Sequence, residues 1–149
     1  MPLRIYRRRL PHWRVEGATY FVTWCLHRGQ SVLMAHERTS VLTVLRRYDR
    51  IRLELIAGVV MDDHVHVVVR PHPGHPLERV VQGWKAASAY RLRQGGRRAP
   101  FWQREYHDRI IRSDSDLREK ILYLANNPLR RWLGMADYPW LHMRVGAEL

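Results

Sequence analysis

Residues 55–71 read LIAGVVMDDHVHVVVRP, two apolar runs that are separated only by Asp62 and Asp63. A two-residue polar link between runs rich in β-branched residues is typical of a tight β-hairpin. Successive side chains of a strand point to opposite faces, so His64 and His66 share one face and the intervening valines share the other. The valine face suits a buried core, and the histidine face is a candidate functional site.

Strand and helix patterns alternate on both sides of this hairpin. Residues 18–26 (ATYFVTWCL) are rich in β-branched and aromatic side chains and predict a first strand, and the apolar spacing over 38–54 predicts a helix. After the hairpin, a helix is predicted over about 76–92 and a fourth strand over 105–113. The order β-α-β-β-α-β predicts an α+β fold. We expect a ferredoxin-like antiparallel sheet with two helices on one face and the other face open for a ligand.

A further helix is predicted to begin at Ser113, because the Ser-x-x-Asp pattern that ends at Asp116 is a helix-capping signal. We expect this helix to run through Tyr123 to about Asn126. A residue that precedes proline avoids helical geometry, so Asn127–Pro128 should end it.

The apolar stripe of this last helix leaves Tyr123 unexplained. At about 100° per residue, Leu117, Ile121 and Leu124 share one side of the helix, and Tyr123 lies well away from that side. Asn127 follows Tyr123 one turn later. A surface tyrosine and an asparagine before proline are both common, so neither residue is decisive alone.

The composition predicts one globular domain over residues 1–149, with a basic N-terminal arm over 1–16 and an irregular tail over 129–149. Hydrophobic residues make up 46% and charged residues 27%, which argues against disorder. Cys25 is the only cysteine, which excludes an internal disulfide and fits a reducing compartment. Because no signal peptide or transmembrane stretch is evident, we expect a cytoplasmic protein, associated with the nucleoid when bound to DNA.

The charge of the chain points to a polyanionic partner. The formal net charge is +12, and nucleic acid is the simplest partner for such a protein. Only Lys85 and Lys120 among the basic residues are lysines. Arginine suits phosphate and guanine, although a GC-rich genome would enrich it as well.

Several stretches together resemble one family. The segment DDHVHVVVRP (62–71), followed by YLANNPLR (123–130), resembles the HUH single-tyrosine transposases of the IS200/IS605 type, and more closely their REP-associated tyrosine transposase branch. The likeness extends over nearly the whole chain. It includes YRRR (6–9) before GATYFVTW (17–24), WKAASAYR (84–91) and FWQREYHDR (101–109).

The resemblance implies a nuclease-ligase that acts on single-stranded DNA near hairpins. In such enzymes two histidines and a polar residue of the tyrosine helix hold one divalent cation, Mg²⁺ or Mn²⁺. Carried over to this sequence, the ligands are His64, His66 and Asn127, with Asn126 as the neighbouring alternative. Tyr123 is then the nucleophile that forms a 5′-phosphotyrosine.

Contacts to DNA are expected from other parts of the chain. The arginines of the arm resemble the family's N-terminal region that is associated with a short guide sequence, and arginines elsewhere suit a phosphate backbone. The candidate DNA-binding residues are Arg7, Arg8, Arg9, Arg97 and Arg98. The candidate stacking platforms for unpaired bases are Trp13, Trp24 and Trp102.

Two other functions remain open from the sequence. The chain could bind DNA hairpins without cutting them, or it could be a metal hydrolase in which Asp62 or Asp63 acts with the histidines on water. Within the family, the short tail and the arginine arm favour a monomer, with a dimer as the alternative. The sequence does not identify the hairpin or guide sequence.

Overall fold

The computed structural model describes residues 3–7 and 11–144. Its elements, in chain order, are β1 (Leu3–Arg7), β2 (Pro11–Val15), β3 (Thr19–Cys25), α1 (Ala35–Arg46), β4 (Leu53–Val60), β5 (His64–Pro71), α2 (Leu77–Gln94), β6 (His107–Ile111), α3 (Asp114–Arg131) and β7 (Leu141–Met143). None of the described helices is both long and apolar enough to span a membrane.

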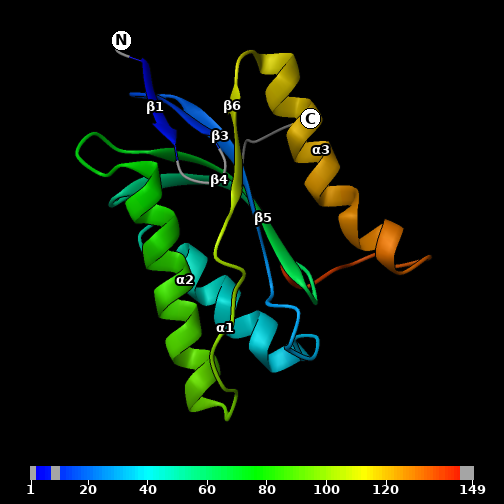
Figure 1. Ribbon diagram of the computed structural model, residues 1–149. Helices are drawn as coiled ribbons and strands as arrows, with labels where there is room; N and C mark the ends of the chain where they lie inside the picture. Colours follow the sequence, from blue (N-terminus) through cyan, green and yellow to red (C-terminus); the bar gives the residue numbers. More distant parts are fainter. Residues whose placement is uncertain (1–2, 8–10, 145–149) are drawn as a thin grey trace.

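A five-stranded antiparallel sheet in the order β6-β3-β5-β4-β7 forms the centre of the molecule (Figure 1). The six elements from β3 to β6 follow the predicted β-α-β-β-α-β order, so the ferredoxin-like arrangement is confirmed. The predicted hairpin is also confirmed. The Met61 amide donates to the His64 carbonyl at 2.8 Å, which leaves Asp62 and Asp63 as the two linking residues.

The two faces of the sheet carry separate cores. Helices α1 and α2 lie on one face and α3 lies on the other (Figure 1). The alternating valines of β5 follow this division. Val65, Val67 and Val69 are buried with α1 and α2, whereas Val68 is buried with Leu124 of α3. The face that we predicted to be open is therefore partly covered by the helix that carries the tyrosine.

Helix α3 begins where its capping signal predicts. The Ser113 hydroxyl accepts a hydrogen bond from the Asp116 amide at 3.1 Å, which satisfies one free amide of the first turn. The predicted apolar stripe is confirmed as well. Ile121 and Leu124 are fully buried against the sheet, and Leu117 packs beside them.

The predicted end of α3 near Asn126 is wrong, because the helix continues through Pro128 to Arg131. Proline within a helix removes one backbone hydrogen bond and crowds the preceding turn. Here Asn127 and Pro128 are both buried, and the Arg131 guanidinium donates to the Asp62 carboxylate at 2.8 Å. Packing and this ion pair offset the cost of the proline.

Both ends of the described chain contain strands that the sequence did not reveal. Within the predicted arm, β1 and β2 pair as a separate two-stranded antiparallel sheet. The tail predicted to be irregular contributes the last helical residues, 129–131, and strand β7. Strand β7 pairs with β4 and so covers an edge that would otherwise expose unpaired backbone groups.

Candidate active site

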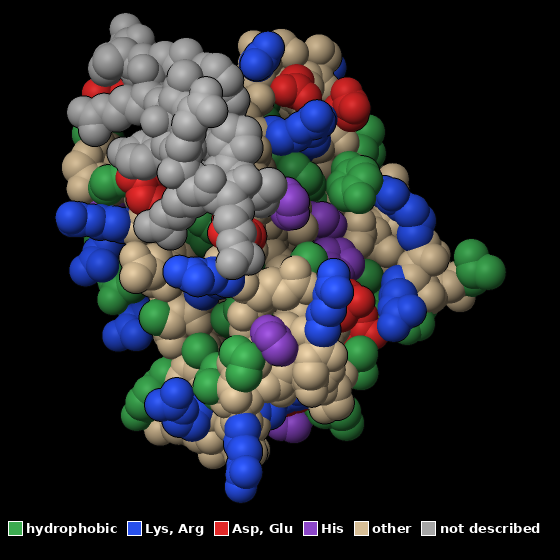
Figure 2. Space-filling view, viewed as in Figure 1, with side chains coloured by type: hydrophobic (Ala, Val, Ile, Leu, Met, Phe, Trp, Pro, Cys, Tyr) green, Lys and Arg blue, Asp and Glu red, His purple; other side chains and the backbone are tan. Residues whose placement is uncertain are grey.

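Strand β5 presents His64 and His66 on the face that α3 covers, with their ring centroids 4.6 Å apart. Figure 2 shows histidine side chains gathered at the surface beside α3. His66 is 6% exposed, and His64 is partly exposed. The predicted sharing of one face by the two histidines is therefore found in the structure.

His66 is fixed by two residues of the neighbouring strand β3. Its Nδ1 lies 2.6 Å from the Thr23 hydroxyl oxygen, and its ring stacks on Phe21 with centroids 5.3 Å apart. Burial, then the charges of His64 and Arg130, lower the pKa of His66 to about 3. At neutral pH the ring is therefore uncharged. In the tautomer whose Nδ1–H donates to Thr23, its Nε2 keeps a free lone pair.

His64 lies between an acidic residue and α3. Its Nδ1 is 2.6 Å from the Asp63 Oδ1, and its Nε2 is 3.0 Å from the Asn127 Oδ1. Because a carboxylate only accepts hydrogen bonds, the imidazole Nδ1–H donates to Asp63. In the neutral ring the Nε2 then presents a lone pair on the side of Asn127.

Helix α3 brings Tyr123 and Asn127 to the histidines. Asn127 is 8% exposed and Tyr123 is 41% exposed. The Tyr123 ring centroid lies 5.4 Å from that of His66 and 5.9 Å from that of Phe21. The alternative ligand Asn126 is exposed, so the amide that meets His64 belongs to Asn127.

Arg130 joins this group and is not among the site residues predicted from the sequence. Its guanidinium carbon lies 4.3 Å from the centre of the Tyr123 ring, and its Nη2 donates to the Tyr123 carbonyl at 3.2 Å. The seven-residue spacing, two helical turns, is the signal that places both residues on one side of α3. Thr23 and Phe21 carried no such signal, because strand register is not legible in one sequence.

The donor set fits a divalent cation. Among the described residues no group of three or more His, Cys, Asp or Glu side chains could hold a metal ion. The set at this site is instead two imidazoles and one amide, from His64, His66 and Asn127. When the His64 ring is neutral and its Nδ1–H donates to Asp63, its Nε2 and the Asn127 Oδ1 are two acceptor atoms 3.0 Å apart, and a cation satisfies such a pair.

The two aspartates of the hairpin serve other partners. The Asp62 carboxylate is buried and pairs with Arg131, and the Asp63 carboxylate contacts the Nδ1 side of His64. In the described part of the chain neither aspartate shares a metal-binding group with the two histidines. The geometry therefore gives no support to the hydrolase alternative.

The candidate DNA-binding arginines have different surroundings. Arg7 lies in β1, whereas Arg8 and Arg9 lie outside the described residues. Arg98 is exposed. The Arg97 guanidinium is enclosed, because all three of its nitrogens donate to internal acceptors: the side chains of Glu37 and Gln30 and the carbonyls of Ser31 and Val32. It offers little to a phosphate backbone.

Two of the candidate stacking platforms are core residues. Trp24 is 0% exposed and stacks on Trp84 with ring centroids 5.7 Å apart, and Trp102 is 7% exposed and meets Trp24 edge-on. The prediction that Trp24 and Trp102 stack on unpaired bases is therefore wrong. The structure does not describe the side chain of Trp13.

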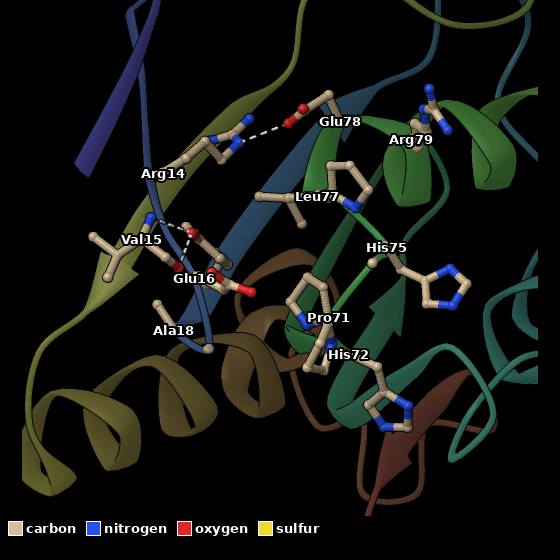
Figure 3. A pocket seen from close by; sticks show the side chains of 15 residues that line it. Arg14, Val15, Glu16, Ala18, Pro71, His72, His75, Leu77, Glu78 and Arg79 are labelled. Atoms are coloured by element: carbon tan, nitrogen blue, oxygen red, sulfur yellow. Dashed lines mark hydrogen bonds and ion pairs between the residues drawn. The ribbon is translucent and has the colours of Figure 1, made fainter. Parts of the chain in front are cut away.

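A separate pocket of about 420 Å³ lies between the turn that joins β2 to β3 and the start of α2 (Figure 3). Arg14 points across it toward Glu78, and the Arg14 Nε and Glu78 Oε2 atoms are 3.0 Å apart. His72, also in its wall, contacts Glu54. None of the residues brought together around the histidine pair lines this pocket.

Comparisons with known proteins agree with this fold. The family described as "Transposase IS200 like" matches residues 14–126. Among solved structures, a REP-associated tyrosine transposase bound to a REP hairpin is 23% identical, with a TM-score of 0.74 over 91% of this chain and 80% of that chain.

A second solved structure is a candidate transposase from Deinococcus radiodurans R1. It is 24% identical, with a TM-score of 0.56 over 76% of this chain and 92% of that chain. No curated protein matches the chain. The two structural likenesses establish the fold, and the family match covers most of the sequence. The chain therefore belongs to the IS200-like transposase family.

Proposed function

We propose that this protein is a metal-dependent single-stranded DNA transesterase that cleaves and rejoins DNA near hairpins through a 5′-phosphotyrosine. The observation that carries the proposal is the position of Tyr123, whose ring lies 5.4 Å from that of His66 while remaining 41% exposed. A tyrosine that is both accessible to DNA and adjacent to a cation-binding group suits nucleophilic attack on phosphate.

His64, His66 and Asn127 would hold one divalent cation, Mg²⁺ or Mn²⁺. A bound cation would polarise the attacked phosphate and offset the charge that develops on its oxygens. The chain's own contribution is to orient the ligands: Thr23 fixes the His66 ring, and Asp63 fixes that of His64. Imidazole and amide groups bind a cation in their neutral forms, so these three ligands would leave the charge of the cation to the phosphate.

The covalent step exchanges one phosphodiester for another. The Tyr123 oxygen attacks phosphorus and gives up its proton, the bond from phosphorus to the 3′ oxygen breaks, and that oxygen takes up a proton. The products are a 5′-phosphate linked to Tyr123 and a free 3′-hydroxyl. Because no phosphodiester is lost, attack by a 3′-hydroxyl reverses the step and reseals DNA without ATP.

Structured DNA is the proposed substrate. The related transposase with a TM-score of 0.74 was solved with a REP hairpin, and the net charge of +12 favours a polyanion. We take the active unit to be a monomer, because Tyr123, His64, His66 and Asn127 all come from one chain.

The test incubates the protein with labelled hairpin DNA that carries single-stranded flanks, together with Mn²⁺. A covalent adduct that survives denaturation is expected from the wild type, and Tyr123→Phe and His64→Ala are expected to abolish it. Tyr90→Phe is the matched control. Tyr90 is 62% exposed on α2 and its hydroxyl contacts only the neighbouring Gln94 side chain among the described residues, so the adduct should persist.

Three outcomes would contradict the proposal. An adduct from Tyr123→Phe would show that another residue is the nucleophile. Tight binding of the hairpin with no adduct from the wild type would favour a non-catalytic DNA-binding protein. Cleavage without protein-linked DNA would favour a hydrolase.

A further inference from the structure

One face of the Tyr123 ring is covered by a positive charge. The Arg130 guanidinium carbon lies 4.3 Å from the ring centre, within the range of a strong cation–π contact. The hydrogen bond from its Nη2 to the Tyr123 carbonyl, at 3.2 Å, holds the side chain back along α3. Phe21 and His66 meet the same ring edge-on, so three side chains surround it.

No carboxylate among the described residues forms an ion pair with Arg130. The adjacent Arg131 differs, because its guanidinium pairs with the buried Asp62. Arg130 is exposed and thus accessible to DNA.

We propose that Arg130 is the positioning residue of the nucleophile: it holds the Tyr123 ring and keeps a fixed positive charge beside the phosphate that Tyr123 attacks. The inference rests on the proposed function and adds a role for a residue beyond the histidines, the amide and the tyrosine. Arg131, one residue later, instead ties the end of α3 to the turn between β4 and β5 through its ion pair with Asp62.

The physical basis is a difference between the ground state and the transition state. As the phenol oxygen loses its proton and attacks, electron density on the ring rises. A cation over the ring is then attracted more strongly than in the resting protein. Loss of this contact should slow the chemical step by about 5- to 30-fold, the range for a cation–π contact that bound DNA shields from water.

Arg130→Gln tests the inference in the full-length protein. The rate of adduct formation is measured in a single turnover with saturating Mn²⁺ and hairpin DNA, so that binding does not limit it. Arg118→Gln is the matched control. Arg118 is exposed on the same helix, and no ion pair or ring contact of the described residues involves it. Its substitution therefore removes an equal charge without removing a contact of this kind.

We expect Arg130→Gln to slow adduct formation by about 5- to 30-fold, Arg118→Gln to leave it within about 2-fold, and Arg130→Lys to restore part of the loss. Rejoining by an added 3′-hydroxyl strand should slow by the same factor, because both directions share one transition state. If Arg130 had a purely structural role, Arg130→Gln would instead lower the urea midpoint of unfolding. If the glutamine variant does not fold, Arg130→Lys still tests the inference, because lysine keeps the positive charge and the aliphatic stem.

Equal single-turnover rates for the wild type and Arg130→Gln would overturn the inference and leave the proposed function intact. The inference also fails if Arg118→Gln slows the reaction as much as Arg130→Gln, since the effect would then be general charge. A wild type that forms no adduct would overturn the proposed function itself, and this inference with it.

Discussion

The Nε2 atom of His64 and the Oδ1 atom of Asn127 lie 3.0 Å apart, although one belongs to the central sheet and the other to the end of α3. With Asp63 accepting the Nδ1–H, a neutral His64 has no proton to share with the amide oxygen. The two atoms then approach as a pair of acceptors. A cation between the strand and the helix would relieve this arrangement and tie α3 to the sheet.

Asn127→Ala should therefore weaken Mn²⁺ binding by at least about tenfold. The measurement is the Mn²⁺ concentration that gives half-maximal adduct formation, supported by the titration of free Mn²⁺ by electron paramagnetic resonance without DNA. Asn126→Ala is the control, because Asn126 is exposed on the same turn. Equal losses in both variants would mean that the amide of Asn127 has no special part in binding the cation.

Thr23→Val should also weaken Mn²⁺ binding, by about 10-fold, although Thr23 does not contact the cation in the proposed site. Valine has the shape of threonine but cannot accept the Nδ1–H of His66, and the 2.6 Å contact would be lost. The ring could then turn and exchange its tautomer. Thr43→Val, on the exposed side of α1, is the matched control. An unchanged Mn²⁺ titration would show that stacking on Phe21 alone fixes the ring.

The histidine pair could be predicted from the sequence because it depends on strand alternation alone. His64 and His66 are two residues apart, and the valines between and after them require a buried face, so only one arrangement satisfies both. The contact between these histidines and Tyr123 could not be predicted in the same way, because it depends on how α3 packs against the sheet. Its apolar stripe at Ile121 and Leu124 predicted that α3 has a buried side but not which face of the sheet receives it.

Predictions from local sequence signals failed where contacts between residues far apart in the sequence outweigh those signals. Asn127–Pro128 is a good helix-ending signal, yet burial of both residues and the ion pair between Arg131 and Asp62 extend α3 past it. Likewise, the sequence made Trp24 a candidate for stacking on bases, but in the structure Trp24 is buried in the core and stacks on Trp84. Such outcomes depend on which helices and strands pack against each other, and a single sequence does not specify this packing.

Acid should weaken a contact between α1 and the segment after α2. Hydrogen bonds from Arg97 lower the pKa of Glu37 below its ordinary value of 4.5. A carboxyl whose pKa is lower in the folded state than in the unfolded state stabilises the fold above the unfolded value. This stabilisation disappears as the pH falls through the folded value.

Glu37→Gln should consequently lower the free energy of unfolding at pH 7, and its difference from the wild type should shrink as the pH falls below about 4.5. Urea titrations at several pH values measure this difference. Glu119→Gln is the control, since the Glu119 side chain is 76% exposed and should matter little at any pH. A difference that does not change between pH 7 and pH 3 would contradict the coupling to Arg97.

Arg97 and Arg98 are adjacent in sequence, but substitution of Arg98 should affect DNA binding, whereas substitution of Arg97 should affect the stability of the fold. Arg98 is exposed, so Arg98→Gln should weaken hairpin binding and reduce the slope of log K against log salt concentration by about 1. Arg97→Gln removes donors from Glu37 and from three other acceptors. It should lower the free energy of unfolding by about 1–3 kcal/mol and leave the salt slope unchanged.

Salt-dependent binding isotherms and urea titrations of both variants separate these effects. Because each variant removes one positive charge from neighbouring positions, a general loss of charge cannot distinguish them, and only the local contacts can. A reduced salt slope in Arg97→Gln with unchanged stability would mean that its guanidinium leaves Glu37 when DNA binds. In that case the enclosed position of Arg97 belongs to the free protein, and the arginine joins the phosphate contacts that the sequence predicted.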